Sequence, residues 1–126
     1  MTQITTPDAP RALGPYSQGR CIGNLLFTAG QIGLDPATLT LPREPEAQIR
    51  QVFANLRAIV TAAGGDTGSI LKLTVYLTDL DHWPLVNSVM ESEFTAPYPA
   101  RTAVGVAALP LGALVEVEAV AQISTF

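Results

Sequence analysis

The stretch EAQIRQVFANLRAIVTAAGGDTGSILKLTVYLTD, residues 46–79, decides the fold. Its first half places apolar residues at three- and four-residue spacing, which predicts an amphipathic helix with the stripe Ile49, Val52, Phe53, Leu56, Ile59, Val60 and Ala63. The opposite face is expected to carry most of the polar residues Gln48, Arg50, Gln51 and Arg57. Pro45 suits the first turn of this helix, and Gly64-Gly65 supplies the left-handed residue that commonly ends one.

The second half of the stretch alternates as a β-strand does. Its apolar face is predicted to comprise Leu71, Leu73, Val75 and Leu77, and its mixed face Lys72, Thr74 and Tyr76. Asp79 or Asp81 can then cap a second helix, in which Pro84 is tolerated in the first turn. The apolar stripe of this helix is Trp83, Val86, Met90 and Phe94.

A β-hairpin is predicted on each side of this central segment. Residues 20–22 and 25–28 are short apolar runs separated by Gly23-Asn24, which tolerates the positive φ of a tight turn. A surface loop with three prolines follows at residues 34–45. Residues 101–107 and 114–123 flank a Leu-Pro-Leu-Gly turn and are interpreted as the second hairpin. The order is therefore ββαβαββ, an α+β fold with two helices on one face of a mixed or antiparallel sheet.

The sheet face that the helices leave uncovered is predicted to hold the functional site. Arg101, Ala103 and Gly105 share one side of the first strand of the last hairpin, and Glu116 and Glu118 share one side of its partner. Charged residues make up only 14% of the chain, against roughly 25% in an average soluble domain. A monomer would therefore expose broad apolar patches. We expect identical chains to meet through this face, with the charged residues lining pockets at the contacts.

Length, charge and composition exclude several classes of protein. The 126 residues suit one domain, spanning 1–126. A net charge of −4 without a basic run disfavours nucleic-acid binding, and no apolar stretch approaches the ~20 residues of a membrane span. The N-terminus shows no secretion signal, so a cytoplasmic location is expected. Cys21, the only cysteine, cannot form an internal disulfide and is predicted to be a buried, inert thiol.

Five motifs occur in an order typical of one family. They are GPYSQG at 14–19, TAGQIGLDPAT at 28–38, VYLTDLD at 75–81, VN at 86–87 and PARTAVGVAALPLGALVEVEAVA at 99–121. Through them the chain resembles the YjgF/YER057c/UK114 family, also called the RidA family, over nearly its whole length. The resemblance implies a chorismate-mutase-like fold, a homotrimer, and clefts between subunits where small 2-imino or 2-keto acids bind.

The resemblance also implies a reaction. Members of the archetypal branch hydrolyse reactive 2-imino and enamino acids, such as 2-aminoacrylate and 2-iminobutanoate, to 2-keto acids and ammonium. Arg101 stands in PARTAV, where this imine deaminase branch carries its substrate arginine. The expected reaction needs no cofactor. The sole histidine, His82, lies in no metal-binding motif, so no metal is predicted.

Two charged residues are the leading candidates for this chemistry. The guanidinium of Arg101 can bind a planar carboxylate through paired donors, and the alternative is a structural ion pair with Glu116 or Glu118. Glu116, the first acid of VEVEAVA, matches the family position for a carboxylate that could orient the attacking water and pass a proton to nitrogen. Its alternative role is that of an interface charge that balances Arg101.

Further pocket positions follow from the resemblance. The family uses Tyr16 to hydrogen-bond substrate or water, the backbone at Gly30 to approach the substrate carboxylate, and Asn87 on the second helix as a pocket residue. Interface packing, a strand-end turn and a solvated helix position are the respective structural alternatives. Ala103 replaces a cysteine of some relatives and could still offer backbone contacts, whereas Ala29 replaces a serine. Both changes could alter rate or substrate range.

Other functions stay open at this point. One is a pathway-specific deaminase of another small unsaturated amino acid. A second is an endoribonuclease or nucleic-acid-binding protein, which the acidic composition disfavours. A third is a ligand-binding or chaperone-like protein without turnover, which an interfacial pocket and apolar surface would also permit.

Overall fold

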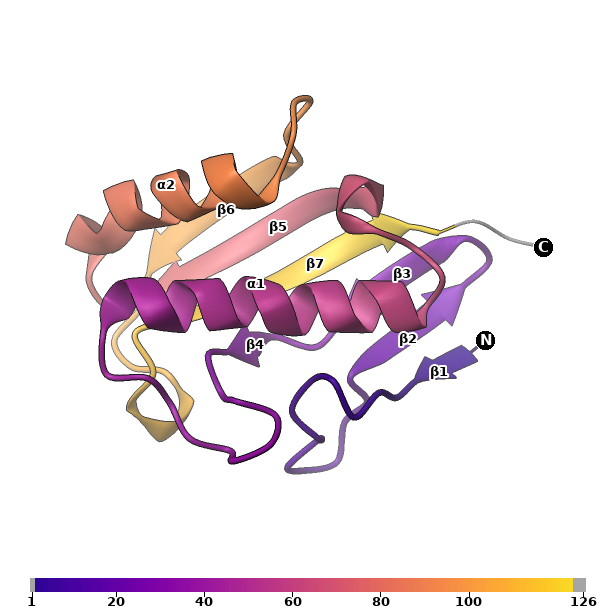
Figure 1. The fold of residues 1–126 in the computed structure, drawn as a ribbon, viewed down its shortest axis with the longest axis horizontal. Helices are drawn as coiled ribbons and strands as arrows, with labels where there is room; N and C mark the ends of the chain where they lie inside the picture. Colours follow the sequence, from indigo (N-terminus) through magenta and orange to yellow (C-terminus); the bar gives the residue numbers. More distant parts are fainter. Residues whose placement is uncertain (1, 124–126) are drawn as a thin grey trace.

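The computed structural model describes residues 2–123, drawn in Figure 1. Its helices and strands are β1 Thr2–Ile4, β2 Gly19–Ile22, β3 Leu25–Thr28, β4 Gln31–Ile32, α1 Pro45–Ala62, β5 Ile70–Leu77, α2 Trp83–Glu93, β6 Ala100–Gly105 and β7 Val115–Gln122. Three short 3-10 turns lie at Thr67–Ser69, Leu80–His82 and Pro110–Gly112. The predicted order ββαβαββ is confirmed, and the structure adds the short strands β1 and β4.

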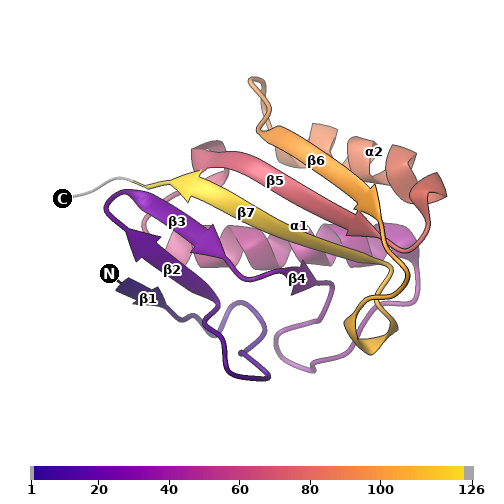
Figure 2. The same ribbon diagram turned by 180° about the vertical axis from the view of Figure 1, so that it is seen from behind.

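All strands belong to one mixed sheet. Its order is β1-β2-β3-β7-β5-β6, and β4 also pairs with β7. Only β5 and β6 run parallel, and the other pairs are antiparallel. Both helices lie on one face, as predicted, and Figure 2 shows that no helix of residues 2–123 covers the other face. We refer to the two sides as the helix face and the open face.

The second predicted hairpin is wrong, because β6 and β7 do not pair. The strand β5 lies between them, with Arg101 of β6 opposite Leu73 and Glu116 of β7 opposite Tyr76. Residues 106–114 form a long connection that includes the 3-10 turn Pro110–Gly112, whereas hairpin loops usually have two to five residues. This connection carries the chain across the end of β5.

The core lies between the two helices and the helix face of the sheet. The predicted stripe of α1 is buried there, except for Ala63, which packs against it only partly buried. Val86, Met90 and Phe94 are buried as predicted, whereas Trp83 is only partly buried. The rings of Phe53 and Phe94 meet edge to face with their centroids 5.7 Å apart, a favourable aromatic geometry that joins the two helices.

A β-bulge corrects the prediction for β5. Its register on β7 shifts between Ile70 and Lys72, so the simple alternation begins only after that point. Ile70 is therefore buried at 7% exposure, while Leu71 is 46% exposed. Leu73, Val75 and Leu77 are fully buried as expected.

The predicted turn and cap signals are largely confirmed. Gly23 has a positive φ of 57° in the turn between β2 and β3, and Gly64 has a φ of 94° just after α1. Asp79 accepts a hydrogen bond from the backbone N–H of Asp81, so it caps the 3-10 turn before α2 rather than α2 itself. Cys21 is buried in the core, as predicted. None of the helices in residues 2–123 has the length and apolar character that crossing a membrane requires.

Two polar residues of α1 are buried, although Gln48 was predicted to lie opposite the apolar stripe and Asn55 was not singled out. Gln48 is 4% exposed and Asn55 is 0% exposed. Gln48 Nε2 donates to the Pro42 carbonyl oxygen at 2.8 Å, and its Oε1 accepts from the Leu114 N–H at 2.9 Å. Asn55 Nδ2 donates to the carbonyl oxygens of Ile32 and Leu34 at 3.2 and 2.9 Å. These amides satisfy backbone groups of irregular segments that run beside the helix.

Replacing Asn55 by leucine is expected to lower the free energy of unfolding by about 1–3 kcal/mol, because two buried carbonyl oxygens lose their donor. Urea denaturation at one fixed protein concentration measures the change. Thr61→Ala, on the exposed side of the same helix, should change the free energy by no more than about 0.5 kcal/mol. Equal stability of the Asn55→Leu variant and the wild type would contradict this role.

Candidate functional site

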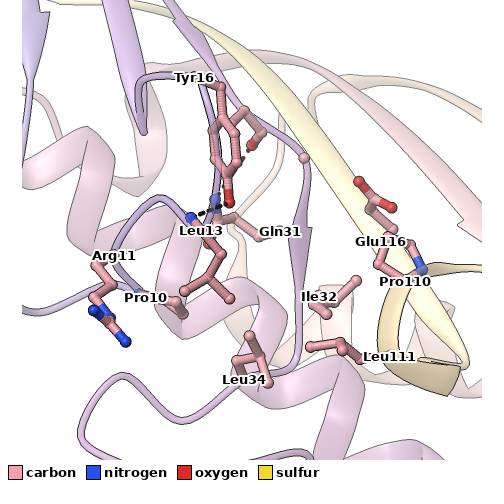
Figure 3. Close-up of a pocket in the computed structure, with 12 residues that line it drawn as sticks. Pro10, Arg11, Leu13, Tyr16, Gln31, Ile32, Leu34, Pro110, Leu111 and Glu116 are labelled. Atoms are coloured by element: carbon pink, nitrogen blue, oxygen red, sulfur yellow. Dashed lines mark hydrogen bonds between the residues drawn. The ribbon is translucent and has the colours of Figure 1, made fainter. Parts of the chain in front are cut away.

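One cavity opens on the side of the sheet that carries Glu116 and is shown in Figure 3. It measures about 500 Å³, and most of its walls are apolar. The N-terminal loop, β4, the Pro110–Gly112 turn and β7 contribute residues to it. Its lining comprises Pro10, Arg11, Leu13, Tyr16, Ala29, Gly30, Gln31, Ile32, Leu34, Pro110, Leu111 and Glu116.

Glu116 stands beside a break between two strands. Both β3 and β4 pair with β7, and the residues between them, Ala29 and Gly30, pair with no strand. A Cβ at position 30 would overlap the Glu116 carboxylate, with Oε2 as the nearest atom. Glycine at this position therefore allows the Glu116 carboxylate to lie against the backbone. The predicted approach of the Gly30 backbone to a substrate carboxylate stays a prediction.

The environment of Glu116 favours its neutral form. Burial raises the pKa of this carboxyl, and the negative charge of Glu118, two residues along the same strand, raises it further. Glu118 accepts a hydrogen bond of 2.5 Å from the hydroxyl of Tyr76 on β5. A carboxyl with a raised pKa in a mostly apolar cavity is suited to accept and return a proton.

Tyr16 lies on another wall of the same cavity and is 51% exposed. Its hydroxyl oxygen accepts a hydrogen bond from the Leu13 N–H at 3.1 Å, drawn as a dashed line in Figure 3. The phenolic proton remains available to donate to a bound molecule. Tyr16 therefore lines the cavity, and its role toward substrate or water stays a prediction.

Gln18 holds the loop that carries Tyr16, a role that the motif GPYSQG did not indicate. Its buried amide accepts from the Thr6 N–H at 2.7 Å and donates to the carbonyl oxygens of Thr6, Ala9 and Pro10 at 3.0, 3.2 and 2.8 Å. Together with Gln48 and Asn55, this residue fixes irregular backbone around the cavity. The sequence alone does not mark such a residue, because Asn and Gln side chains are mostly exposed in folded proteins. A buried amide is therefore recognised only from the structure.

A second cavity, of about 380 Å³, surrounds Arg101 at the edge of the sheet. It is lined by Asn87, Met90, Glu91, Tyr98, Pro99 and Arg101. Arg101 Nη1 donates to Asn87 Oδ1 at 2.7 Å and contacts Met90 Sδ at 3.3 Å. The guanidinium carbon lies 4.3 Å from the centroid of the Trp83 ring, a cation–π distance. Trp83, Glu91 and Tyr98 were not among the predicted site residues.

The anchoring of Arg101 leaves donors available. Nη1 is engaged by Asn87 and Met90, while Nε and Nη2 form no hydrogen bond within residues 2–123. The aromatic ring and the amide hold the guanidinium plane in one orientation. Arg101 can therefore present paired N–H groups to a carboxylate with little loss of side-chain entropy.

The predicted site residues divide into two groups on opposite faces of one sheet. Arg101 pairs with the buried Leu73 and contacts α2, so it lies on the helix face. Glu116 pairs with Tyr76 on the open face. The expectation that both charges share the uncovered face is therefore wrong, because their partners on β5, Leu73 and Tyr76, are three residues apart and point to opposite faces of the sheet. For the same reason, no ion pair joins Arg101 to Glu116 or Glu118 within residues 2–123.

Five of the predicted site residues line one of the two cavities. Tyr16, Gly30 and Glu116 share the first cavity, and Asn87 and Arg101 share the second. Ala103 lies on β6 and packs partly buried against the core, outside the lining of both cavities. Ala29, which replaces the serine of relatives, lines the first cavity. Within residues 2–123, no three His, Cys, Asp or Glu side chains are grouped as metal ligands would be.

The fold and these two cavities define a class of protein: a small α+β protein with a mixed sheet, helices on one face, and two separate cavities, one lined by a glutamate and the other by an arginine. A family model described as Endoribonuclease L-PSP matches residues 6–123. The chain therefore belongs to this family, which is the YjgF/RidA family that the motifs indicate.

Individual relatives match over nearly the whole chain. The 2-iminobutanoate/2-iminopropanoate deaminase of Escherichia coli strain K12 is 46% identical over 121 residues, which cover 94% of each protein. The crystal structure of RidA from the Antarctic bacterium Psychrobacter sp. is 45% identical, with a TM-score of 0.96 over 98% of this chain and 100% of that one. The structure of E. coli TdcF with bound serine is 42% identical, with a TM-score of 0.94 over 98% and 100%.

Proposed function

We propose that the chain is a hydrolytic deaminase that converts small 2-imino acids and their enamino tautomers, such as 2-aminoacrylate and 2-iminobutanoate, to 2-keto acids and ammonium. The proposal rests on two side chains. Arg101 is anchored and keeps free N–H donors, and Glu116 has a raised pKa and lies beside Gly30. The deaminase name of the E. coli relative supports the same reaction. We place the reaction in the cytoplasm, where a lone buried thiol such as Cys21 is ordinary.

We further propose that the reaction takes place between subunits of a homotrimer. Arg101 and Glu116 lie on opposite faces of the sheet, so one chain cannot direct both at one small molecule. A neighbouring chain could bring its Arg101 cavity against the Glu116 cavity. The open face also exposes apolar side chains that favour subunit contact, namely Ile22, Phe27 and Val104.

In this arrangement each group has one chemical task. Arg101 binds the substrate carboxylate through its free donors and holds the C=N carbon in place. Glu116 accepts a proton from water while the water oxygen forms a bond to that carbon, and it then returns the proton to nitrogen. The C–N bond breaks as the new hydroxyl becomes the keto oxygen. The hydroxyl proton passes through Glu116 to the departing amino group, which leaves as ammonia and takes up a further proton from solvent to become ammonium.

The test is to generate 2-iminobutanoate in situ with threonine dehydratase and to follow formation of 2-ketobutyrate. The wild-type chain should accelerate release of the keto acid in proportion to its concentration. The surface variant Arg50→Ala, whose one ion pair within residues 2–123 is the exposed one with Glu46, should accelerate it equally. Absence of acceleration by the wild type would overturn the proposal. Salt-dependent cleavage of RNA by the same pure protein would instead favour an endoribonuclease.

Gly30→Ala is expected to lower this activity by up to about 10²-fold while leaving the fold intact, because small displacements of a reacting group have effects of this size. The added Cβ overlaps the end of the flexible Glu116 side chain, which can swing away. Thermal unfolding and kcat/KM measured on the same sample separate the two effects. Full activity of the Gly30→Ala variant would show that Glu116 need not lie against residue 30.

A further inference from the structure

The open face carries a cluster of three titratable side chains that extends beyond the predicted site. Tyr76 of β5 is directly opposite Glu116 of β7, and Glu118 follows two residues later on the same face. Tyr76 Oη donates to Glu118 Oε1 at 2.5 Å. The carboxylate of Glu116 forms no hydrogen bond or ion pair with any described residue. The two neighbouring glutamates therefore have unequal surroundings.

The hydrogen bond from Tyr76 makes the two glutamates chemically different. A phenol has a single proton to donate, and in this cluster the proton is directed at Glu118. Such a bond stabilises the ionised form of the carboxylate that accepts it. Glu116 receives no comparable donor and lies against the mostly apolar cavity. Two carboxylates in different environments can thereby take different protonation states, as acid and base pairs in active sites do.

We propose that Tyr76 and Glu118 are positioning residues that keep the proton of this cluster on Glu116. Glu118 holds the negative charge, Tyr76 secures it there, and Glu116 becomes the group that exchanges a proton with whatever occupies the cavity. The bearing of this cluster on catalysis rests on the deaminase function proposed above. The distribution of the proton itself does not, because it follows from the contacts within one chain.

Neighbouring charges agree with this assignment. Burial raises the pKa of Glu116, and the charge of Glu118 adds to the increase. The hydrogen bond to Glu118 is the main cause of a raised pKa at Tyr76, which keeps the phenol protonated. From the other walls of the cavity, the titratable groups are Arg11 and Tyr16 of the N-terminal loop, while β4 and the Pro110–Gly112 turn contribute neutral residues. In the proposed trimer, the positive charge of Arg101 from an adjoining chain would lower the pKa of Glu116, and it would do so equally in all the variants.

The direct test is to titrate the side-chain carboxyl of Glu116 by NMR, using protein with ¹³C-labelled glutamate and the Glu116→Gln variant for assignment. Glu118→Gln keeps an acceptor for Tyr76 but removes the charge, so Glu116 should titrate at lower pH than in the wild type, though still above its ordinary range because burial remains. Tyr76→Phe keeps the charge but removes the donor. The hydrogen bond that secures the charge on Glu118 is then lost, and the midpoint of Glu116 should again move to lower pH.

The control is Glu46→Gln, which alters an exposed glutamate of α1 whose ion pair in the described part of the chain is with Arg50. It should leave the Glu116 midpoint unchanged. An unchanged midpoint in both the Tyr76→Phe and Glu118→Gln variants would overturn the proposal, even where their thermal stability falls, because a purely structural role would affect stability alone. The titration needs no substrate, so it gives a result whether or not the chain hydrolyses imines.

Kinetics then test the link to catalysis. The acid limb of the pH profile of kcat/KM reports the free enzyme's catalytic base. In both variants this limb should move to lower pH, in the same direction as the NMR midpoint. A midpoint that moves while the limb stays would show that the cluster is correctly described and that Glu116 is not the catalytic base.

Discussion

Arg101→Ala is expected to lower kcat/KM for imine hydrolysis by about 10²–10³-fold. The variant loses paired charge-assisted hydrogen bonds to the substrate carboxylate, each contributing about 1.5–3 kcal/mol, and part of this loss is offset by water. Arg101 lies at the edge strand β6 and is only partly buried, so the fold and the proposed trimer should persist. The measurement is the coupled keto-acid assay, with the oligomeric state checked by light scattering.

Two further variants make the arginine result specific. Arg101→Lys keeps a positive charge but loses the planar fork and stacks less well on Trp83, so it should recover only part of the lost activity. Arg50→Ala, an exposed arginine on α1, should match the wild type. Wild-type activity of an Arg101→Ala protein that remains assembled would remove this residue from the mechanism.

Glu116→Gln is expected to lower kcat/KM by about 10²–10⁴-fold, the usual contribution of a positioned acid or base. The amide has nearly the same shape but cannot carry the proton between water and nitrogen. In the wild type the raised pKa of Glu116 sets the sign of the pH dependence. The active carboxylate is present above that pKa and is lost as pH falls through it, so the acid limb should lie above the ordinary range for glutamate near 4.3. A profile with its limb in that ordinary range would contradict the assignment.

Mixing the two inactive variants tests whether one pocket uses two chains. When Arg101→Ala and Glu116→Gln proteins are unfolded together and reassembled in equal amounts, about one quarter of the pockets should combine an intact arginine with an intact glutamate, since each contributing chain is suitable about half of the time. Activity should return to about that fraction of the wild-type value. No recovery in verified mixed oligomers would place both residues in pockets formed by a single chain.

Local periodicity and turn chemistry predicted most of the fold. The stripe of α1, the turn at Gly23 and the end of α1 at Gly64 each depend on neighbouring residues, and each is confirmed. Strand pairing was harder, because β6 and β7 are adjacent in the sequence yet separated in the sheet by β5. The bulge that exposes Leu71 depends on register with another strand, which alternation alone does not contain.

The residues of the candidate site could likewise be predicted in part, whereas their arrangement in space could not. Arg101 and Glu116 were found through a resemblance of motifs, and their surroundings are compatible with the roles that it implied. That they face opposite sides of the sheet could not be predicted, since each was judged only along its own strand. Asn55 was missed entirely, because its partners are the backbone carbonyls of Ile32 and Leu34, and nothing in the side-chain pattern marks a buried amide.

The placement of the two charges on opposite faces also has a genetic consequence. In the proposed trimer every chain serves two pockets, giving its arginine to one and its glutamate to the other. A chain that has lost both groups but still assembles would silence both pockets that it touches, and only the pocket between the two intact chains would survive. When such an allele is expressed beside the normal one, it should therefore act as a dominant inhibitor, whereas an allele that cannot assemble would be recessive.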